Sequence, residues 1–198
     1  MIQATLIQRT LLLFSLLYLS ACGINNIPAY DEATTAAWSE VLNQYKRRAD
    51  LIPNLVKTVQ GSADYERGVL NEIVDARSKA TQTQLPPEML NDPQAFQKFQ
   101  AAQDGLSSAL SRLLVVVENY PDLKANQNFL QLQSQIEGTD NRIAVARRDY
   151  IKSVQNLNTE LRTYPGKLWH SFLHSDVQAK PQFTAPDDVM EVPEIQFN

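Results

Sequence analysis

The chain has 198 residues, 43% of them hydrophobic and 20% charged, a composition that suits one globular domain and excludes intrinsic disorder. The formal net charge of −4 argues against nucleic acid as a partner, because a polyanion is bound by basic surfaces. Only 6 glycines are present and good helix formers are frequent, so we expect an all-α protein without a sheet.

Residues 1–21 have the form of an export signal. A weakly basic start leads into the apolar run Leu11–Leu19, about half the roughly 20 residues of a membrane-spanning helix. The following motif, LSAC, resembles the lipobox of bacterial lipoproteins, in which the cysteine receives diacylglycerol and the chain is cut before it. This resemblance implies cleavage between Ala21 and Cys22 and lipidation of Cys22, the only cysteine. The alternative is an ordinary signal or an uncleaved anchor with a chance cysteine.

Lipidation of Cys22 would make the lipid bilayer a partner, since two or more acyl chains hold a protein stably on a membrane. We expect residues 22–30 to form a short tether to the folded domain. The residue after the cysteine is Gly23 and not aspartate, which favours the outer membrane, facing the periplasm, if the organism is Gram-negative.

The segment 31–83 carries an apolar stripe that returns at alternating steps of four and three residues, from Trp38 to Ile73. Such a repeat keeps one face of a long helix against a partner helix, as in coiled coils and helical bundles. Asp31 or Thr34 is expected to cap this helix. Pro53 and Gly61-Ser62 are both weak points, so the choice between one helix and two stays open.

A second long helix is predicted over residues 93–120. The preceding segment, 82–92, contains Pro86-Pro87 and forms the first firm loop. Asp92 can cap the helix with Pro93 in its first turn, and the helix ends where Tyr120 precedes a proline.

A third long helix is predicted over about residues 126–164. Gly138 inside it costs about 1 kcal/mol relative to alanine, which predicts that a neighbouring backbone comes close there. Short turns between long amphipathic helices predict an up-and-down antiparallel bundle of three to four helices over residues 31–166. For residues 167–198 we expect one short helix and then an extended, partly mobile tail.

Three stretches resemble the LemA family of bacterial envelope proteins. They are NQYKRRADLIPNLV from Asn43 to Val56, VENYPDLKAN from Val117 to Asn126, and NFLQLQSQIEGTDNRIAVARRDY from Asn128 to Tyr150. The resemblance covers nearly all of residues 31–166 and is weaker past Lys167. It implies a helical bundle tied to a membrane at its N-terminus, and it brings no catalytic residue and no cofactor.

Polar residues within these stretches allow two interpretations. They could form caps, inter-helix ion pairs and hydrogen bonds that fix the helix register. They could also form a basic surface for a partner or for anionic lipid headgroups, because a guanidinium binds carboxylate or phosphate at two points. The candidates for this surface are Arg47, Arg48, Arg142, Arg147 and Arg148, and the wider polar set adds Asn43, Asp50, Glu118, Asn119, Asn128, Glu137, Asp140 and Asp149.

His170 and His174 have the i, i+4 spacing of paired zinc ligands. Asp176 is the only local third ligand and the sequence has no HExxH motif, so we interpret the pair as polar residues of a short helix and expect no metal. The chain also has no glycine-rich phosphate loop and no GxSxG motif, so we expect no enzymatic activity.

The sequence thus predicts a non-enzymatic lipoprotein of the cell envelope, acting as a scaffold or adaptor for an envelope protein. The alternative is a helical module that binds a small molecule or a metal in the bundle core or at the histidine pair.

Overall fold

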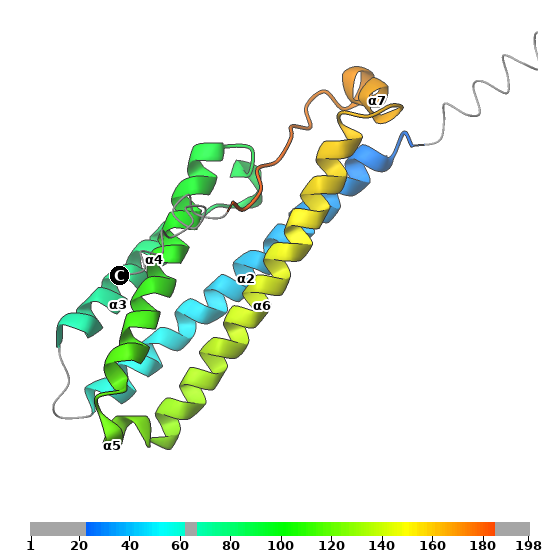
Figure 1. Ribbon diagram of the computed structural model, residues 1–198. Helices are drawn as coiled ribbons and strands as arrows, with labels where there is room; N and C mark the ends of the chain where they lie inside the picture. Colours follow the sequence, from blue (N-terminus) through cyan, green and yellow to red (C-terminus); the bar gives the residue numbers. More distant parts are fainter. Residues whose placement is uncertain (1–22, 62–66, 185–198) are drawn as a thin grey trace, which may run out of the picture.

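A computed structural model describes residues 23–61 and 67–184, which are mostly helical and contain no strand (Figure 1). The long helices are α2 (Asn26–Gln60), α3 (Arg67–Gln82), α4 (Pro93–Val117) and α6 (Gln127–Glu160). The short elements are the 3-10 turn η1 (Pro87–Met89), α5 (Pro121–Lys124) and α7 (Gly166–Leu173). The prediction of an all-α bundle is confirmed. The signal segment and Cys22 lie outside the described residues.

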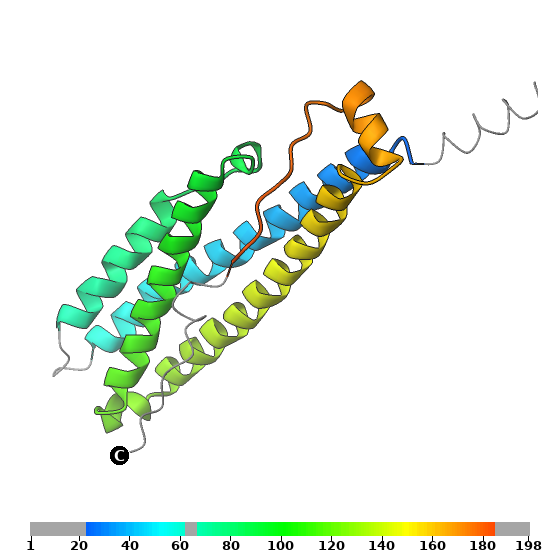
Figure 2. The same ribbon diagram turned by 45° about the horizontal axis from the view of Figure 1, so that its top comes forward.

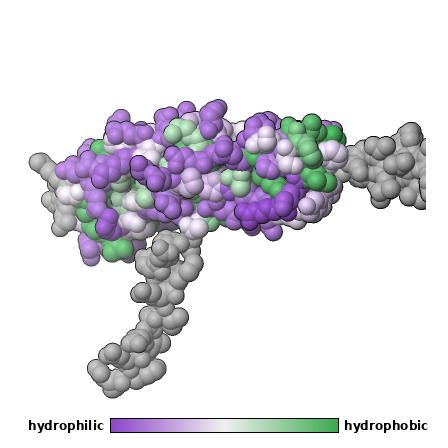
Figure 3. All heavy atoms as spheres, turned by 90° about the horizontal axis from the view of Figure 1, so that it is seen from above, coloured by the Kyte–Doolittle hydropathy of each residue, from purple (hydrophilic) through white to green (hydrophobic). Residues whose placement is uncertain are grey.

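The long helices form two antiparallel pairs. Helix α2 packs along α6, and α3 packs along α4. The pairs lie close together at the α5 end and separate toward the α7 end, as the two views in Figures 1 and 2 show. The face in Figure 3 is largely hydrophilic, and its largest apolar patch lies toward one end.

Helix α2 begins at Asn26, so the expected caps at Asp31 and Thr34 are wrong. The reason is burial, because Ile27 is fully buried against Leu157 and Leu161 at the end of α6. The expected tether is correspondingly shorter, since residues 26–30 are helical.

Helix α2 continues through Pro53 and ends at Gln60. The first apolar run is therefore two helices, α2 and α3, and the segment that joins them begins at Gly61. A proline inside a helix leaves the carbonyl four residues earlier without its N–H donor. Here that carbonyl belongs to Ala49, and Nε of Arg77 on α3 donates a hydrogen bond to it at 2.8 Å.

The predicted start of α4 is confirmed. The side chain of Asp92 accepts hydrogen bonds from the backbone N–H groups of Gln94 and Ala95, which have no partner inside the helix. Asn126 caps α6 in the same way, by accepting from Asn128 and Phe129.

The prediction for Gly138 is wrong. A Cβ atom placed there would meet nothing within 4 Å apart from its own helix and its chain neighbours, so no backbone approaches closely. The close approach occurs instead at Gly166, where a Cβ would collide with the carbonyl oxygen of Glu160 and lie 2.8 Å from its side-chain Cγ and Cδ atoms. Only glycine allows α7 to begin so near the end of α6.

An aromatic cluster fills the space between the two helix pairs. Its members are Trp38, Tyr45, Phe96, Phe99, Tyr150 and Phe183. The ring centroid of Trp38 lies 5.1 Å from that of Tyr150 and 5.3 Å from that of Phe99, at tilted or edge-on angles that aromatic quadrupoles favour. The cluster joins α2, α4 and α6.

Residues 174–184 form an extended strap that runs from α7 back between the helix pairs (Figures 1 and 2). Phe183 is buried in the aromatic cluster, and the Tyr150 hydroxyl donates to the Pro181 carbonyl at 3.0 Å. The Asn158 side chain donates a hydrogen bond to the Lys180 carbonyl and accepts one from the Lys180 backbone N–H. Nζ of Lys180 lies 3.2 Å from Asp31 Oδ1. The prediction of an extended tail is correct here, but these contacts hold it against the bundle.

Candidate binding cleft

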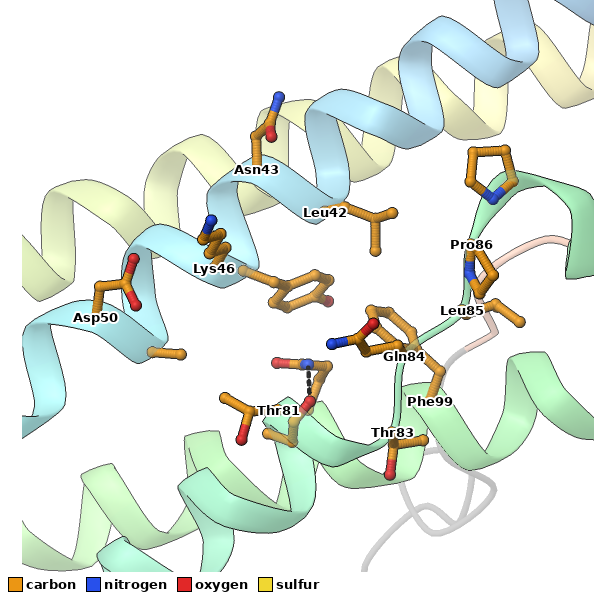
Figure 4. A pocket seen from close by; sticks show the side chains of 15 residues that line it. Leu42, Asn43, Lys46, Asp50, Thr81, Thr83, Gln84, Leu85, Pro86 and Phe99 are labelled. Atoms are coloured by element: carbon orange, nitrogen blue, oxygen red, sulfur yellow. Dashed lines mark hydrogen bonds between the residues drawn. The ribbon is translucent and has the colours of Figure 1, made fainter.

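A cleft of about 480 Å³ opens between α2 and the segment that joins α3 to α4 (Figure 4). It is lined by Leu42, Asn43, Tyr45, Lys46, Ala49, Asp50, Ala80, Thr81, Thr83, Gln84, Leu85, Pro86, Pro87, Phe99 and Gln103. Five of these residues belong to the NQYKRRADLIPNLV stretch of α2. The volume lies within the roughly 300–1,000 Å³ of small-ligand sites.

The floor of the cleft is apolar and firmly held. Leu42 points toward Leu85 and Phe99 across the cleft (Figure 4). The indole N–H of Trp38 donates to the Leu85 carbonyl at 2.8 Å, which fixes this part of the loop to α2. Gln103 is buried and donates from Nε2 to the Ala80 carbonyl at 3.2 Å, so α4 also holds the end of α3. The cleft is therefore a preformed feature of the packing.

The rim of the cleft is polar. Asn43, Lys46 and Asp50 are exposed on α2 at spacings of three and four residues, which places them along one face of the helix. Thr81 and Gln84 are exposed on the opposite side. An apolar floor with a few polar groups around it is the arrangement of a binding site, where the floor supplies affinity and the rim supplies orientation.

Behind the floor, Arg48 joins three helices. Its side chain is only 3% exposed, and Nη1 donates to Ser107 Oγ at 2.8 Å and to Asp140 Oδ1 at 3.2 Å. Nη2 donates to the backbone and side-chain oxygens of Gln103 at 3.1 and 3.0 Å. The expectation that Arg48 belongs to a docking surface is therefore wrong, because burial and these bonds use its guanidinium to fix α2, α4 and α6.

The other arginines of the expected basic surface are separated. Arg147 is half-buried, with its guanidinium carbon 4.1 Å from the ring centroid of Phe183 in the strap. Arg47, on α2, and Arg142 and Arg148, on α6, are exposed. Acidic side chains share this surface, since Arg142 lines a shallow depression together with Glu40 and Asp149.

Two tyrosine hydroxyls near the cleft stay protonated at neutral pH. Burial raises the pKa of Tyr150 far above its ordinary value of 10.0. Burial also raises the pKa of Tyr45, with a smaller contribution from Asp104, while the positive charges of Arg147 and Arg48 oppose the rise. The Tyr150 hydroxyl donates its hydrogen bond to the Pro181 carbonyl, whereas the Tyr45 hydroxyl has Arg147 as its side-chain partner.

His170 and His174 do not point to a metal site. The Val177 carbonyl can only accept, so His170 Nε2, 2.9 Å away, carries the hydrogen of their bond and ties α7 to the strap. Within residues 23–61 and 67–184, no group of three or more His, Cys, Asp or Glu side chains is placed to hold a metal ion. None of the helices in those ranges has the length and apolar composition needed to cross a bilayer.

Sequence reasoning missed Phe99, Gln103 and the loop around Leu85 as parts of the cleft. Gln103 could have been found, because it occupies an apolar-stripe position between Phe99 and Leu106, where a polar residue needs an internal partner. Pro86-Pro87 signalled a rigid loop, but nothing local indicated which helix that loop would face.

The fold and these contacts define an elongated all-α bundle in which the buried Arg48 joins three helices and an open cleft lies beside α2. The chain belongs to the LemA family, whose model matches residues 37–197. The resemblance of the three motif stretches is thereby confirmed. The match also includes α7 and the strap, so the likeness extends beyond the Lys167 limit expected from the motifs.

Three magnetosome proteins are similar to this chain. Magnetosome proteins MamQ 1 and MamQ 2 of Paramagnetospirillum magneticum are each 26% identical over 157 residues, which cover 71% of this chain and 58% of the relative. Magnetosome protein MamQ of Magnetospirillum gryphiswaldense is 24% identical over 136 residues, covering 61% of this chain and 50% of the relative. The chain thus spans 50–58% of the length of these relatives.

Proposed function

We propose that the protein is a lipid-anchored, non-enzymatic adaptor of the bacterial cell envelope that binds a partner protein in the α2 cleft. The family match and the similarity to the MamQ proteins support a place at an envelope membrane. In a Gram-negative organism the proposed location is the outer membrane, facing the periplasm, because Gly23 follows the lipidation site.

The observation that carries the proposal is the position of Gly23. Its carbonyl accepts from the Asn26 N–H at 3.0 Å, and the Asn26 side chain donates to Glu160 at the end of α6 at 3.2 Å. The residue after Cys22 is therefore held at one end of a bundle whose α2 alone is about 50 Å long. A lipid on Cys22 would hold the bundle by this end.

The anchor leaves the cleft accessible. The rim residues 43–50 lie about 25–35 Å along α2 from Asn26, at a rise of about 1.5 Å per residue. A partner that contributes an apolar side chain to the floor and hydrogen bonds to Asn43, Lys46 or Asp50 fits both the lining and the distance from the membrane.

Lipidation is tested with Cys22→Ala. Without the thiol no diacylglycerol can be attached, so the variant is expected to accumulate as a larger precursor that takes up no labelled palmitate. Ala21→Gly keeps a small residue before the cleavage point and is the matched control, expected to mature normally. A Cys22→Ala protein that is processed and membrane-bound like the wild type contradicts the proposal.

The adaptor role is tested by photo-crosslinking in intact cells. A crosslinking amino acid in place of Lys46, on the rim, is expected to give a discrete adduct with one envelope protein. The same amino acid in place of Lys152, exposed on α6 outside the cleft, is the control and should not give it. The adduct should disappear when Leu42→Arg fills the floor. An adduct that survives Leu42→Arg or also forms at residue 152 contradicts the use of the cleft.

The volume and lining of the cleft also support a second candidate, a small amphipathic ligand in place of a partner protein. Such a ligand should raise the melting temperature of the wild type and not that of Leu42→Arg, because it stabilises only the folded state that binds it. Metal binding at the histidine pair has no such support, since His170 Nε2 is already bonded to Val177.

A further inference from the structure

The end of the bundle that contains α7 exposes an unusual amount of apolar surface. Tyr164, Leu168, Phe172 and Leu173 are 72%, 46%, 79% and 55% exposed. They are four of the nine large hydrophobic side chains that are exposed in the described residues, and the other five are spread over α3, η1, α4 and α6. We call these four residues the α7 face.

Helix α7 has apolar side chains both toward the bundle and toward the outside. Trp169 points inward and packs with Ile27 and Leu161, which fixes the helix to the bundle. The α7 face points outward, with Leu168 and Phe172 one turn apart on the same side of the helix. The green side chains at one end of the molecule in Figure 3 show this concentration of apolar groups.

The described chain begins beside this face. A Cβ on Gly23 would lie 3.7 Å from Cγ of Pro165, which is the residue just before α7. Consecutive Cα atoms are about 3.8 Å apart, so Cys22 joins the bundle within one residue of this point. Any attachment of Cys22 to a bilayer therefore brings the α7 end of the bundle to the lipid surface.

We propose that the α7 face inserts into the headgroup region of the bilayer to which Cys22 attaches the protein. The position of that bilayer rests on the proposed function, whereas the exposed face itself is a property of the fold. Interfacial helices bury their apolar side about 5–10 Å into the headgroup and acyl boundary. Tyrosine suits this depth, and the exposed Arg162 and Lys167 can reach anionic headgroups beside it.

The consequence is a fixed orientation. A lipid on Cys22 alone restrains one point of the molecule and leaves the bundle free to tilt. A second contact through the α7 face restrains the tilt and holds the α2 cleft away from the membrane, toward a partner in the aqueous space.

The test places a fluorescent amino acid at residue 172 of the full-length protein. After expression with its own leader, the protein is reconstituted into vesicles of phosphatidylethanolamine and phosphatidylglycerol that contain brominated lipids, which quench fluorophores by contact. The control position is Val115, which is 70% exposed near the far end of α4. Mass spectrometry of the same sample reports whether Cys22 is acylated.

We expect the emission from residue 172 to shift to the blue and to be quenched several-fold more than that from residue 115. Leu168→Asp should reduce this quenching. Emission from residue 172 that resembles that of residue 115, in protein that floats with the vesicles, overturns the membrane contact and leaves the anchor intact. A fluorophore that is shielded from water but not quenched by bromine also overturns the membrane contact. That result would mean that the α7 face packs against a protein surface.

The remaining outcomes separate this inference from the anchor on which it rests. Quenching at residue 172 in protein without an acyl group on Cys22 supports the α7 contact and overturns the lipid anchor. Protein that is neither acylated nor associated with the vesicles overturns both.

Discussion

Nε of Arg77 on α3 lies 2.8 Å from the carbonyl oxygen of Ala49 on α2. In an uninterrupted helix this carbonyl would accept from the N–H of residue 53, and Pro53 has none. Helix α3 thus supplies the donor that α2 lacks, which explains how α2 passes through a proline without ending. The same bond joins two helices whose connecting segment lies outside the described residues.

The first prediction is an energetic coupling between Arg77 and Pro53. Arg77→Met is expected to destabilise the protein by about 1–3 kcal/mol, because it leaves a buried carbonyl at Ala49 without a partner. Pro53→Ala restores the helical N–H, so Arg77→Met should cost less in that background. Urea unfolding of the two single variants and the double variant measures the coupling. Strictly additive effects would mean that the two residues act independently.

The second prediction separates Arg48 from its neighbour Arg47. Arg48→Ala should lower the free energy of unfolding by about 1–3 kcal/mol or more, because it leaves the buried Gln103 side-chain oxygen unpaired and removes the link between α2, α4 and α6. Asp140→Asn should cost less, at most about 1 kcal/mol, since this carboxylate is 48% exposed.

Arg47→Ala is the matched control, because Arg47 is exposed on the same helix. Its effect should stay within about 0.5 kcal/mol. Equal losses for Arg47→Ala and Arg48→Ala in denaturant titrations would contradict the buried network.

The third prediction concerns the strap. Phe183→Ala should cost up to about 3–5 kcal/mol, because it removes a ring packed on Trp38, Phe96 and Tyr150. The strap should then detach, and amide exchange of residues 177–184 should accelerate more than that of α6. Phe172→Ala, at an exposed position, is the control and should leave stability nearly unchanged. Unaltered exchange in Phe183→Ala would show that the polar contacts of Lys180 hold the strap alone.

The helices were largely predictable because their information is local. The spacing of apolar residues predicted the buried faces of α2, α3, α4 and α6, and Asp92-Pro93 predicted the start of α4. What remained open depended on contacts between distant residues. Pro53 and Gly61 both interrupt the helical pattern of the sequence. The helix continues through Pro53, where Arg77 on α3 supplies the missing donor to the Ala49 carbonyl, a contact that the local sequence does not reveal.

The candidate site was less predictable for the same reason. Arg47 and Arg48 are adjacent and chemically identical, and a shift of one position around the helix buries one and exposes the other. The mixed composition of residues 174–184 suggested mobility, because its contacts with Asn158, Tyr150 and the aromatic cluster involve residues 20 or more positions away. Local composition cannot report such contacts.

The fourth prediction is a loss of stability at alkaline pH. Burial raises the pKa of Tyr45 and Tyr150 in the folded state above the ordinary value of 10.0 that unfolded chains have. The unfolded state therefore releases these protons first as pH rises. The stability due to the neutral hydroxyls is complete below pH 10 and is lost above it, by up to about 1.4 kcal/mol per pH unit for each tyrosine.

Denaturant titrations between pH 8 and about pH 12 measure this slope. Tyr150→Phe should lower stability below pH 10, because the bond to the Pro181 carbonyl is lost, and should make the slope above pH 10 shallower, so that the difference from the wild type shrinks as the pH rises. The same slope in Tyr150→Phe and the wild type would mean that this hydroxyl titrates alike in both states.

The fifth prediction compares Gly138, where a side chain would have free space, with Gly166, where it would collide with Glu160. Gly138→Ala should stabilise the protein by up to about 1 kcal/mol, because alanine loses less entropy in the middle of α6 and the new methyl group meets no neighbouring element within 4 Å. Gly166→Ala should destabilise it, because its methyl group would collide with the Glu160 carbonyl where α7 begins.

The collision at residue 166 can be relieved only by moving α7, so Gly166→Ala should also loosen the packing of Trp169. The fluorescence of Trp169 reports this change, because the buried Trp38 contributes a constant background. Thermal unfolding of the two variants gives opposite signs if the α6–α7 junction is built this way, and the same sign for both would contradict it.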